Sequence, residues 1–249
     1  MLAEERRNKI LERLAAKGQV LSAELVREFA VSEDTIRRDL KEMADAGLLK
    51  KVHGGAMPCT TVPYDYGERQ GLNVAAKSAI AARAGALVRD GMLIFIDGAT
   101  TTAQIAQHLP AGLRATFVTH SVATASALAG LSRSTIILLG GKVIPELLIT
   151  SGPESVQQAK SFMPDLAVIS VHGISVAGGA TVESYDDAVV KAEFVRNAGE
   201  TAVLAGHEKL AFLGAYKVAD VGDLSYLISD ADDAHLAPFS EAGLTVWKV

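Results

Sequence analysis

Apolar residues recur every three or four positions in three short segments at the start of the chain, which predicts three helices around one small core. The first helix is expected over residues 4–17 and the second after Ser22, which can cap it. The third is expected to begin at about Glu33, capped by Ser32. Their inward-facing residues are Ile10, Leu11 and Leu14, then Leu25, Val26 and Phe29, and then Ile36, Leu40 and Met43.

The predicted third helix carries its cations on the side that faces away from the core. Glu33 and Asp34 place negative charge in its first turn, where that charge complements the helix dipole. The outward positions of the first two to three turns are Thr35, Arg37, Arg38 and Lys41. This is the surface that a recognition helix presents to the major groove of DNA.

A basic segment follows the third helix. Gly47 is expected to end that helix, and Leu48 and Leu49 are expected to return to the core. The chain then presents Lys50, Lys51 and His53, followed by Gly54 and Gly55. Because two glycines permit a turn with positive φ, this stretch predicts a wing with cations where a phosphate backbone would pass.

Charge by itself leaves the DNA hypothesis open. Residues 1–57 contain 11 Lys plus Arg and 10 Asp plus Glu, and the rest of the chain contains 13 and 19, so the net charges are +1 and −6. The arginines could therefore belong to an ordinary solvated helix face, paired with Glu33, Asp34 and Glu42 one turn away. The basic signal is local and consists of Arg37, Arg38, Lys41, Lys50 and Lys51.

From Ala75 onward, short apolar runs alternate with alanine-rich helical segments. This alternation predicts an α/β domain with a mostly parallel, doubly wound sheet, whose ligands bind at the carboxyl ends of the strands. The predicted strands are 92–97, 115–120, 135–140, 165–171, 201–206 and 225–230.

Two domains are expected, over residues 1–57 and 74–249, with a linker over 58–73, where prolines, tyrosines and a glycine interrupt the helical pattern. A chain of 249 residues with 49% hydrophobic residues can build a core beyond the first domain. A single cysteine, Cys59, excludes an intrachain disulfide and favours a reducing compartment. No secretory signal or membrane span is expected, which predicts a cytoplasmic protein.

Polar residues collect where the predicted strands end. After 92–97 comes Asp97-Gly98-Ala99-Thr100-Thr101-Thr102 and then a helical segment, whose free N–H groups could hold an anion. The threonines could equally do no more than cap and start that helix.

The next two strand ends carry weaker signals. Ser121 can cap a helix, and His120 could bond either a sugar hydroxyl or a backbone carbonyl. Gly140 and Gly141 follow the third strand and are expected near a ligand, whereas Lys142 is expected to be a solvated loop charge.

The stretch VSEDTIRRDLKEMADAGLLKKVHGGA, residues 31–56, closely resembles the amino-terminal signature of the DeoR family of bacterial transcription regulators. The resemblance continues through the Gly98 to Thr102 loop, the VTHS segment and the LGG segment. It implies a second domain similar in fold to sugar-phosphate isomerases such as ribose 5-phosphate isomerase. Members of this family usually repress sugar-catabolic operons until a phosphorylated sugar binds.

Lys191 bears on whether the second domain is an enzyme or a sensor. The resemblance to ribose 5-phosphate isomerase puts Lys191 where those enzymes have a glutamate base, eighteen residues before Lys209. An ammonium group of ordinary pKa does not abstract a proton from a sugar carbon at pH 7, although it can bind a phosphate or a sugar oxygen. Glu183, Asp186 and Asp187 remain as nearby carboxylates.

One segment departs from the family pattern. This chain has LAGHEKL where regulators of the family commonly have L-A-D-x-S-K-F-G, so the aspartate is lost at Gly206 and the serine at Glu208. His207 and Lys209 remain available to a ligand. We therefore expect a phosphorylated sugar or polyol without a prediction of which one.

These patterns together predict a DNA-binding transcription regulator, most simply a repressor of a sugar or polyol catabolic operon that a phosphorylated effector releases. A homo-oligomer, a dimer or tetramer, is expected on operator DNA, with no cofactor, no metal and no catalytic group. Two alternatives are an isomerase-like enzyme with an accessory DNA-binding domain and a DNA-binding scaffold whose pocket is empty.

The predicted contacts form two sets. The DNA contacts are Ser22, Ser32, Thr35, Arg37, Arg38, Lys41, Lys50, Lys51 and His53. The effector contacts are Asp97, Gly98, Thr100, Thr101, Thr102, His120, Ser121, Gly140, Gly141, Lys191, His207 and Lys209.

Overall fold

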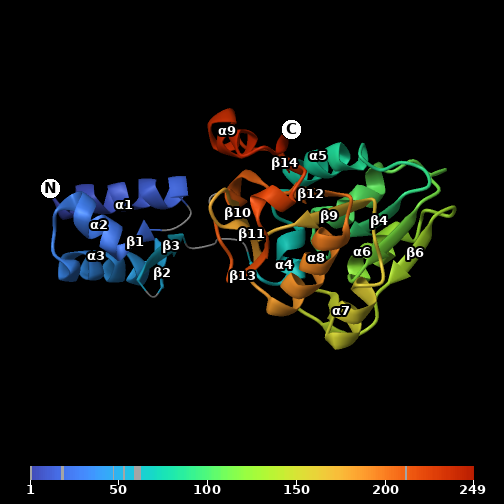
Figure 1. The fold of residues 1–249 in the computed structure, drawn as a ribbon, viewed down its shortest axis with the longest axis horizontal. Helices are drawn as coiled ribbons and strands as arrows, with labels where there is room; N and C mark the ends of the chain where they lie inside the picture. The colour runs from blue at the N-terminus through green and yellow to red at the C-terminus, as the bar shows by residue number, and fades with distance from the viewer. Residues whose placement is uncertain (1, 18–19, 47, 53, 59–62, 211) are drawn as a thin grey trace.

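The computed structural model describes residues 2–17, 20–46, 48–52, 54–58, 63–210 and 212–249. The amino-terminal part is a winged helix-turn-helix, as predicted, and lies beside a larger α/β part (Figure 1). Its helices are α1 (Ala3–Lys17), α2 (Ser22–Phe29) and α3 (Glu33–Asp45). Its antiparallel sheet has the order β1-β3-β2, from β1 (Val20–Leu21), β2 (Leu49–Val52) and β3 (Gly55–Pro58).

The predicted core of this part is confirmed at its main positions. The buried side chains include Ile10, Leu14, Leu25, Ile36, Leu40, Met43 and Leu49. Two details of the prediction were wrong. Ser22 is the first residue of α2 and not its cap, because the extended residue before the helix is Leu21. Leu48 is 51% exposed and does not return to the core.

The wing turn needs both of its glycines. Gly54 has φ of 79°, a conformation that side chains disfavour. A side chain at Gly55 would collide with the backbone carbonyl of Val20 on β1. The predicted roles of Gly47 and His53 lie outside the described residues.

The α/β part is built on a seven-stranded parallel sheet in the order β15-β14-β12-β9-β4-β5-β6. The strands are β4 (Leu93–Ile96), β5 (Thr116–Thr119), β6 (Thr135–Leu138), β9 (Leu166–Ser170), β12 (Glu200–Leu204), β14 (Tyr226–Ser229) and β15 (Thr245–Lys248). The six predicted strands are all present. The seventh, β15, was not predicted.

Side chains alternate between two cores, one on each face of this sheet. On β4, Phe95 packs into one core, while Ile94 and Ile96 pack into the other. The Phe95 face is covered by α7 (Pro153–Ala159), α8 (Tyr185–Asn197) and α9 (Asp233–Glu241). The opposite face is covered by α5 (Val74–Gly85), the 3-10 helix η1 (Thr102–His108) and α6 (Val122–Leu128).

Smaller elements surround the carboxyl edge of the main sheet. One antiparallel sheet consists of β10 (Gly173–Ser175), β11 (Gly179–Val182) and β13 (Tyr216–Ala219). A hairpin consists of β7 (Lys142–Ile144) and β8 (Ile149–Ser151), and the 3-10 turns are η2 (His207–Lys209) and η3 (Val221–Asp223).

A short helix, α4 (Tyr66–Gln70), forms inside the predicted linker and lies among the elements of the α/β part (Figure 1). Within the described part of the chain, no helix is long and apolar enough to span a bilayer.

Candidate functional site

Helix α3 presents the predicted DNA-facing side chains on its outer surface. The Oγ of Ser32 accepts a hydrogen bond from the Thr35 N–H at 3.2 Å, which confirms the predicted cap. Arg37, Arg38 and Lys41 are exposed, and so are Lys50 and Lys51 on the neighbouring strand β2.

A buried ion pair fixes which side of α3 faces outward. Asp39 is 2% exposed, and its two carboxylate oxygens accept hydrogen bonds from Arg6 Nε at 2.5 Å and Arg7 Nε at 3.2 Å. Since both arginines belong to α1, Asp39 ties α3 to α1 and leaves Arg37 and Arg38 pointing away from the core. The hydrophobic pattern did not predict this contact.

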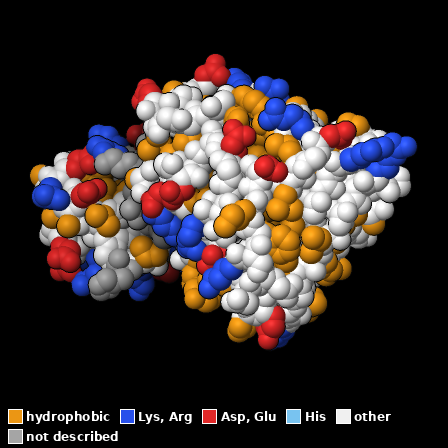
Figure 2. Space-filling model, turned by 45° about the vertical axis from the view of Figure 1, so that its right-hand side comes forward, with side chains coloured by type: hydrophobic (Ala, Val, Ile, Leu, Met, Phe, Trp, Pro, Cys, Tyr) orange, Lys and Arg blue, Asp and Glu red, His pale blue; other side chains and the backbone are white. Residues whose placement is uncertain are grey.

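Arg37 also pairs within its own helix. Its guanidinium lies 2.5 Å from Asp34 Oδ1, and both side chains are largely exposed. Figure 2 shows acidic and basic side chains interspersed on the amino-terminal part, in line with its small net charge. An exposed pair of this kind contributes only about 0.5 kcal/mol, so a base or phosphate of DNA can replace Asp34 at little cost.

A pocket lies where β4 and β9 end in the α/β part, with about 370 Å³ of empty space including its open mouth. Ser170, Val171 and His172 form one wall at the end of β9. The other residues that line it are Pro63, Tyr64, Arg69, Ala99, Leu147, Val182, Glu183, Ser184, Asp187 and Lys191. This is the edge at which parallel sheets bind their ligands.

Lys191 forms the centre of a buried polar network behind the pocket. Its Nζ lies 2.8 Å from Asp97 Oδ2 and 2.8 Å from Asp187 Oδ2, and it donates to the Ser170 carbonyl at 3.0 Å. Burial by itself would lower the pKa of Lys191, but Asp187 and Asp97 together raise it. The ammonium is therefore held charged by the chain's own carboxylates.

Asp97 organises the loop that follows β4. Its Oδ1 accepts a hydrogen bond from Thr102 Oγ1 at 2.5 Å, and its Oδ2 accepts one from the Ser170 N–H at 2.7 Å. The hydroxyl of Thr102 is thus engaged with Asp97, and among the described residues no threonine side chain caps the helix that follows. Thr100 and Thr101 are also buried, and the helix that begins at Thr102 is a 3-10 helix.

His120 pairs with a carboxylate in place of the backbone carbonyl that was one of its two expected partners. Its Nε2 lies 2.9 Å from Asp187 Oδ1, and its ring stacks on Phe95 with 5.7 Å between the ring centres. Burial would raise the pKa of Asp187, but Lys191 and then His120 hold that pKa well below its ordinary value. His120 therefore stabilises a charged carboxylate of the pocket wall.

Two side chains in this region have strongly lowered pKa values. Burial, with Lys209 and Arg69 nearby, lowers the pKa of His172 to about 4. Burial also lowers the pKa of Lys209 to about 8, and its Nζ donates to Ser170 Oγ at 3.1 Å. His172 is thus neutral at pH 7, with its Nε2 at 3.5 Å from Glu183 Oε1 but without a hydrogen bond among the described residues.

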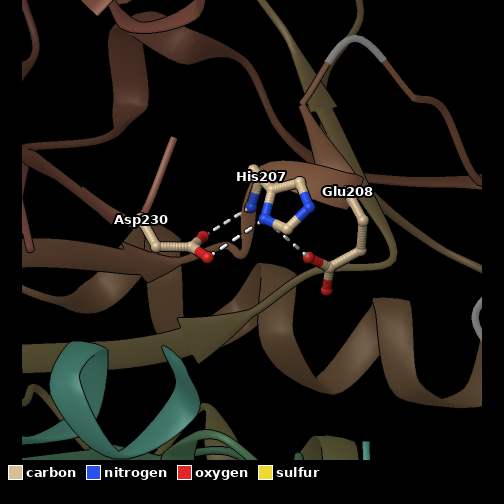
Figure 3. A group of neighbouring side chains, drawn as sticks. All are labelled: His207, Glu208 and Asp230. Carbon is tan, nitrogen blue, oxygen red and sulfur yellow. Dashed lines mark hydrogen bonds and ion pairs between the residues drawn. The ribbon is translucent and has the colours of Figure 1, made fainter. Parts of the chain in front are cut away.

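The strand-end residues His207, Glu208 and Asp230 form a separate group (Figure 3). His207 Nδ1 lies 3.0 Å from Asp230 Oδ2 and 3.8 Å from Glu208 Oε2. The three side chains offer ligand atoms within 4.8 Å of one another, a donor set that a divalent cation accepts. The hydrogen bond to Asp230 raises the pKa of His207, which favours the protonated imidazole beside the two carboxylates.

The two departures at Gly206 and Glu208 lie side by side in the structure. The carboxylate of Glu208 occupies the space beside the Cα of Gly206, so a side chain at 206 would require that carboxylate to move.

The structure brings part of the predicted effector set together. Lys191 lines the pocket, while Asp97, His120 and Lys209 contact residues that line it. Ser121 caps α6 through the Thr124 N–H at 3.2 Å, as predicted. Gly98 and Thr100 to Thr102 belong to the loop after β4. The remaining members, which lie on other segments, are Gly140, Gly141 and His207.

Sequence reasoning did not place Arg69 or His172 at the site, and it named Glu183 only as a nearby carboxylate. Arg69 lies in the segment that was predicted to be a linker, and His172 and Glu183 belong to the glycine-rich excursion between β9 and α8. One sequence signal for Arg69 was available. Asp65 caps α4 through the Glu68 N–H, and Arg69 is a charged residue on the helical turn that follows.

Two family models match this chain. Residues 6–62 match a DeoR-like helix-turn-helix domain, and residues 72–231 match a DeoR C terminal sensor domain. The chain belongs to the DeoR family. The resemblance seen in the sequence is thus confirmed, and the protein is a DNA-binding transcription regulator with a sensor domain.

Curated relatives cover almost the whole of this DeoR-family chain. The HTH-type transcriptional repressor GlcR of Bacillus subtilis is 31% identical, over 92% of this chain and 89% of its own. The HTH-type transcriptional regulator GlpR of Haloferax volcanii is 30% identical, over 99% of this chain and 98% of its own. The glycerol-3-phosphate regulon repressor of Escherichia coli is 28% identical, over 92% and 90%.

Solved structures show more distant likenesses. The sorbitol operon regulator SorC from Klebsiella pneumoniae aligns over 94% of this chain and 98% of its own, with 12% identity and a TM-score of 0.46. Ribose 5-phosphate isomerase from Methanocaldococcus jannaschii aligns over 55% and 54%, with 16% identity and a TM-score of 0.40.

Proposed function

We propose that this regulator represses an operon for the catabolism of a sugar or polyol, and that the phosphorylated form of that compound binds the pocket and releases the protein from DNA. The observation that carries this proposal is a pair of buried nitrogen atoms in the pocket wall, Arg69 Nε and His172 Nε2. Neither has a hydrogen-bond partner among the described residues. Buried polar groups are normally bonded, so a polar ligand is the expected partner.

The pocket also offers the chemistry that a phosphorylated polyol requires. Arg69 supplies a cation suited to a phosphoryl group. Glu183 and Ser184 supply acceptors for hydroxyl groups. The names of the relatives support the same ligand class, because one is a glycerol-3-phosphate regulon repressor.

The pocket binds its ligand without turning it over. The position equivalent to an isomerase base holds Lys191, whose ammonium is bonded to Asp97 and Asp187 and is unable to accept a proton while so charged. Incubation with ribose 5-phosphate tests this point, and formation of the ketose would contradict it.

The regulator acts in the cytoplasm as a homo-oligomer, a dimer or tetramer, so that two α3 helices read a repeated or palindromic operator. Arg37 and Arg38 contact base edges and phosphates, and Lys41, Lys50 and Lys51 hold the DNA backbone. The DNA-binding domain comprises residues 1–57, and the linker comprises residues 58–73. The domain that senses the effector and assembles the oligomer comprises residues 74–249. An effector that prefers the released state tenfold weakens operator binding by about 1.4 kcal/mol per site.

The experiment is a thermal-shift assay of the full chain against a panel of phosphorylated sugars and polyols, each with its unphosphorylated form as the control. A ligand at one hundred times its Kd stabilises the folded state by about 2.7 kcal/mol, and the melting temperature should rise by roughly 5 to 10 °C. A rise with one phosphorylated compound only is the expected result. Equal rises with phosphorylated and unphosphorylated forms would contradict the proposal.

A further inference from the structure

The segment that joins the winged helix to the sensor domain forms part of the pocket wall. Pro63, Tyr64 and Arg69 of this segment line the pocket together with residues of β9 and α8. We propose that Arg69 is the anchor for the anionic group of the effector, so that an occupied pocket fixes the position of the linker helix α4. This inference rests on the function proposed above.

Arg69 is the cation among the described pocket-lining residues that has no carboxylate within 4.0 Å. Its Nε is buried without a hydrogen-bond partner, and it forms no ion pair within 4.0 Å in the part of the chain that the structure describes. Burial lowers the pKa of Arg69 in spite of the distant carboxylates Asp187 and Asp97. A buried N–H group without an acceptor is unfavourable, and a bound anion would supply that acceptor.

The other cations of this region are already engaged. Lys191 is bonded to Asp97 and Asp187, and Lys209 donates to Ser170 Oγ. The Nζ of Lys77 donates to the carbonyl of Arg69 itself. A ligand anion would have to displace these contacts to reach the lysines, whereas Arg69 needs no rearrangement.

Two contacts orient helix α4 before any ligand binds, and a ligand on Arg69 would add a further one. Tyr66 is 5% exposed, and its N–H donates to the carbonyl of Glu146 at 2.7 Å. Asp65 caps the helix through the Glu68 N–H at 3.1 Å. Arg69 is therefore preorganised toward the pocket, which reduces the entropy that binding must overcome.

The position of Arg69 links the pocket to the DNA-binding part through a short tether. The last residue of β3 is Pro58, and α4 begins at Tyr66. A chain of that length reaches at most about 28 Å when fully extended. A ligand that fixes α4 thus restricts where each winged helix can lie, and so whether two of them match the operator spacing.

The test compares the full-length wild type with Arg69→Gln, Arg69→Lys and the control Arg133→Gln, which removes an exposed arginine before β6. Titration calorimetry measures the affinity for inorganic phosphate, glycerol 3-phosphate and ribose 5-phosphate. Hydrogen exchange of the α4 amides is then followed with and without the best of these ligands.

The expected result is at least tenfold weaker binding by Arg69→Gln, an intermediate loss in Arg69→Lys, and unchanged binding by Arg133→Gln. Ligand should slow α4 exchange in the wild type and leave it unchanged in Arg69→Gln. If Arg69→Gln does not fold, a threefold or greater loss in Arg69→Lys carries the test.

Wild-type affinity in Arg69→Gln, or α4 exchange that a saturating ligand leaves unaltered in the wild type, would overturn the role of Arg69 and leave the proposed function standing. A wild type that binds none of the three phosphate compounds would overturn the role of Arg69, and the thermal-shift panel then decides whether the proposed function stands.

Discussion

Lys191 Nζ lies 2.8 Å from Asp97 Oδ2, which places a cation of α8 against a carboxylate that follows β4 and is fully buried. The same ammonium lies 2.8 Å from Asp187. Lys191 stands where the resemblance to isomerases would place their base. Its ammonium instead holds two elements of the sensor domain together.

Replacing Lys191 with Met should therefore destabilise the sensor domain, because it leaves two buried carboxylates without their cation. The expected loss is about 3 to 5 kcal/mol in the free energy of unfolding near pH 7. The loss should shrink at acid pH, because burial raises the pKa of Asp187 once the cation of Lys191 is gone. Urea unfolding at pH 5 and pH 8 measures both effects, with the exposed Lys142→Met as the control. Lys191→Met with wild-type stability would show that the network is not structural.

Asp39 makes a comparable contact in the winged helix. Because Asp39→Ala leaves the buried Arg6 without its partner, we expect a loss of about 3 kcal/mol in the stability of this part. The control is Asp45→Ala, which removes an exposed carboxylate at the end of the same helix. Circular dichroism during heating should reveal an early unfolding step only for Asp39→Ala. Identical melting of the two variants would refute the role of Asp39.

Arg37 is expected to supply sequence-specific contacts to the operator. Arg37→Ala should weaken operator binding by about 1 to 3 kcal/mol and relax base preference at one position of the site. Fluorescence anisotropy with an operator selected from random DNA by the wild type measures this effect. The exposed Arg89 of the sensor domain provides the control, Arg89→Ala. Unchanged affinity and base preference in Arg37→Ala would reject the assignment of α3 as the recognition helix.

His172 should make stability depend on pH. Burial lowers its pKa from 6.5 to about 4 in the folded chain. As the pH falls below 6.5, His172 takes up a proton in the unfolded state but not in the folded state. The free energy of unfolding therefore decreases between pH 6.5 and pH 4. The slope from this one group approaches about 1.4 kcal/mol per pH unit. Urea unfolding of the wild type and His172→Gln over this range tests the point, and parallel curves would contradict it.

The main sheet could be predicted because its strands are continuous apolar runs such as residues 93–96 and 166–170, which only a sheet buried on both faces requires. The winged helix could be predicted because apolar residues recur every three or four positions in its helices and because Ser32 caps α3. In contrast, β10 and β11 fall in a glycine-containing stretch whose pairing depends on β13, far along the chain. The local pattern of apolar and polar residues does not show which distant strand will pair with them.

The site was predictable only in part for the same reason. The loop after β4 and Lys191 could be identified as polar groups at strand ends. Their pairing with each other, and the pairing of His120 with Asp187, depend on the packing of α8 against β9, which spacing alone does not fix. Arg69 was missed because a five-residue helix is too short to show a periodic pattern.

The most direct measurement is the affinity of the full-length protein for its operator, titrated by anisotropy in the presence of each member of a panel of phosphorylated sugars and polyols. One phosphorylated compound should weaken operator binding at least tenfold, and its unphosphorylated form should have no effect. Operator affinity that stays the same with every phosphorylated compound, at concentrations that saturate the pocket, would contradict ligand-released repression.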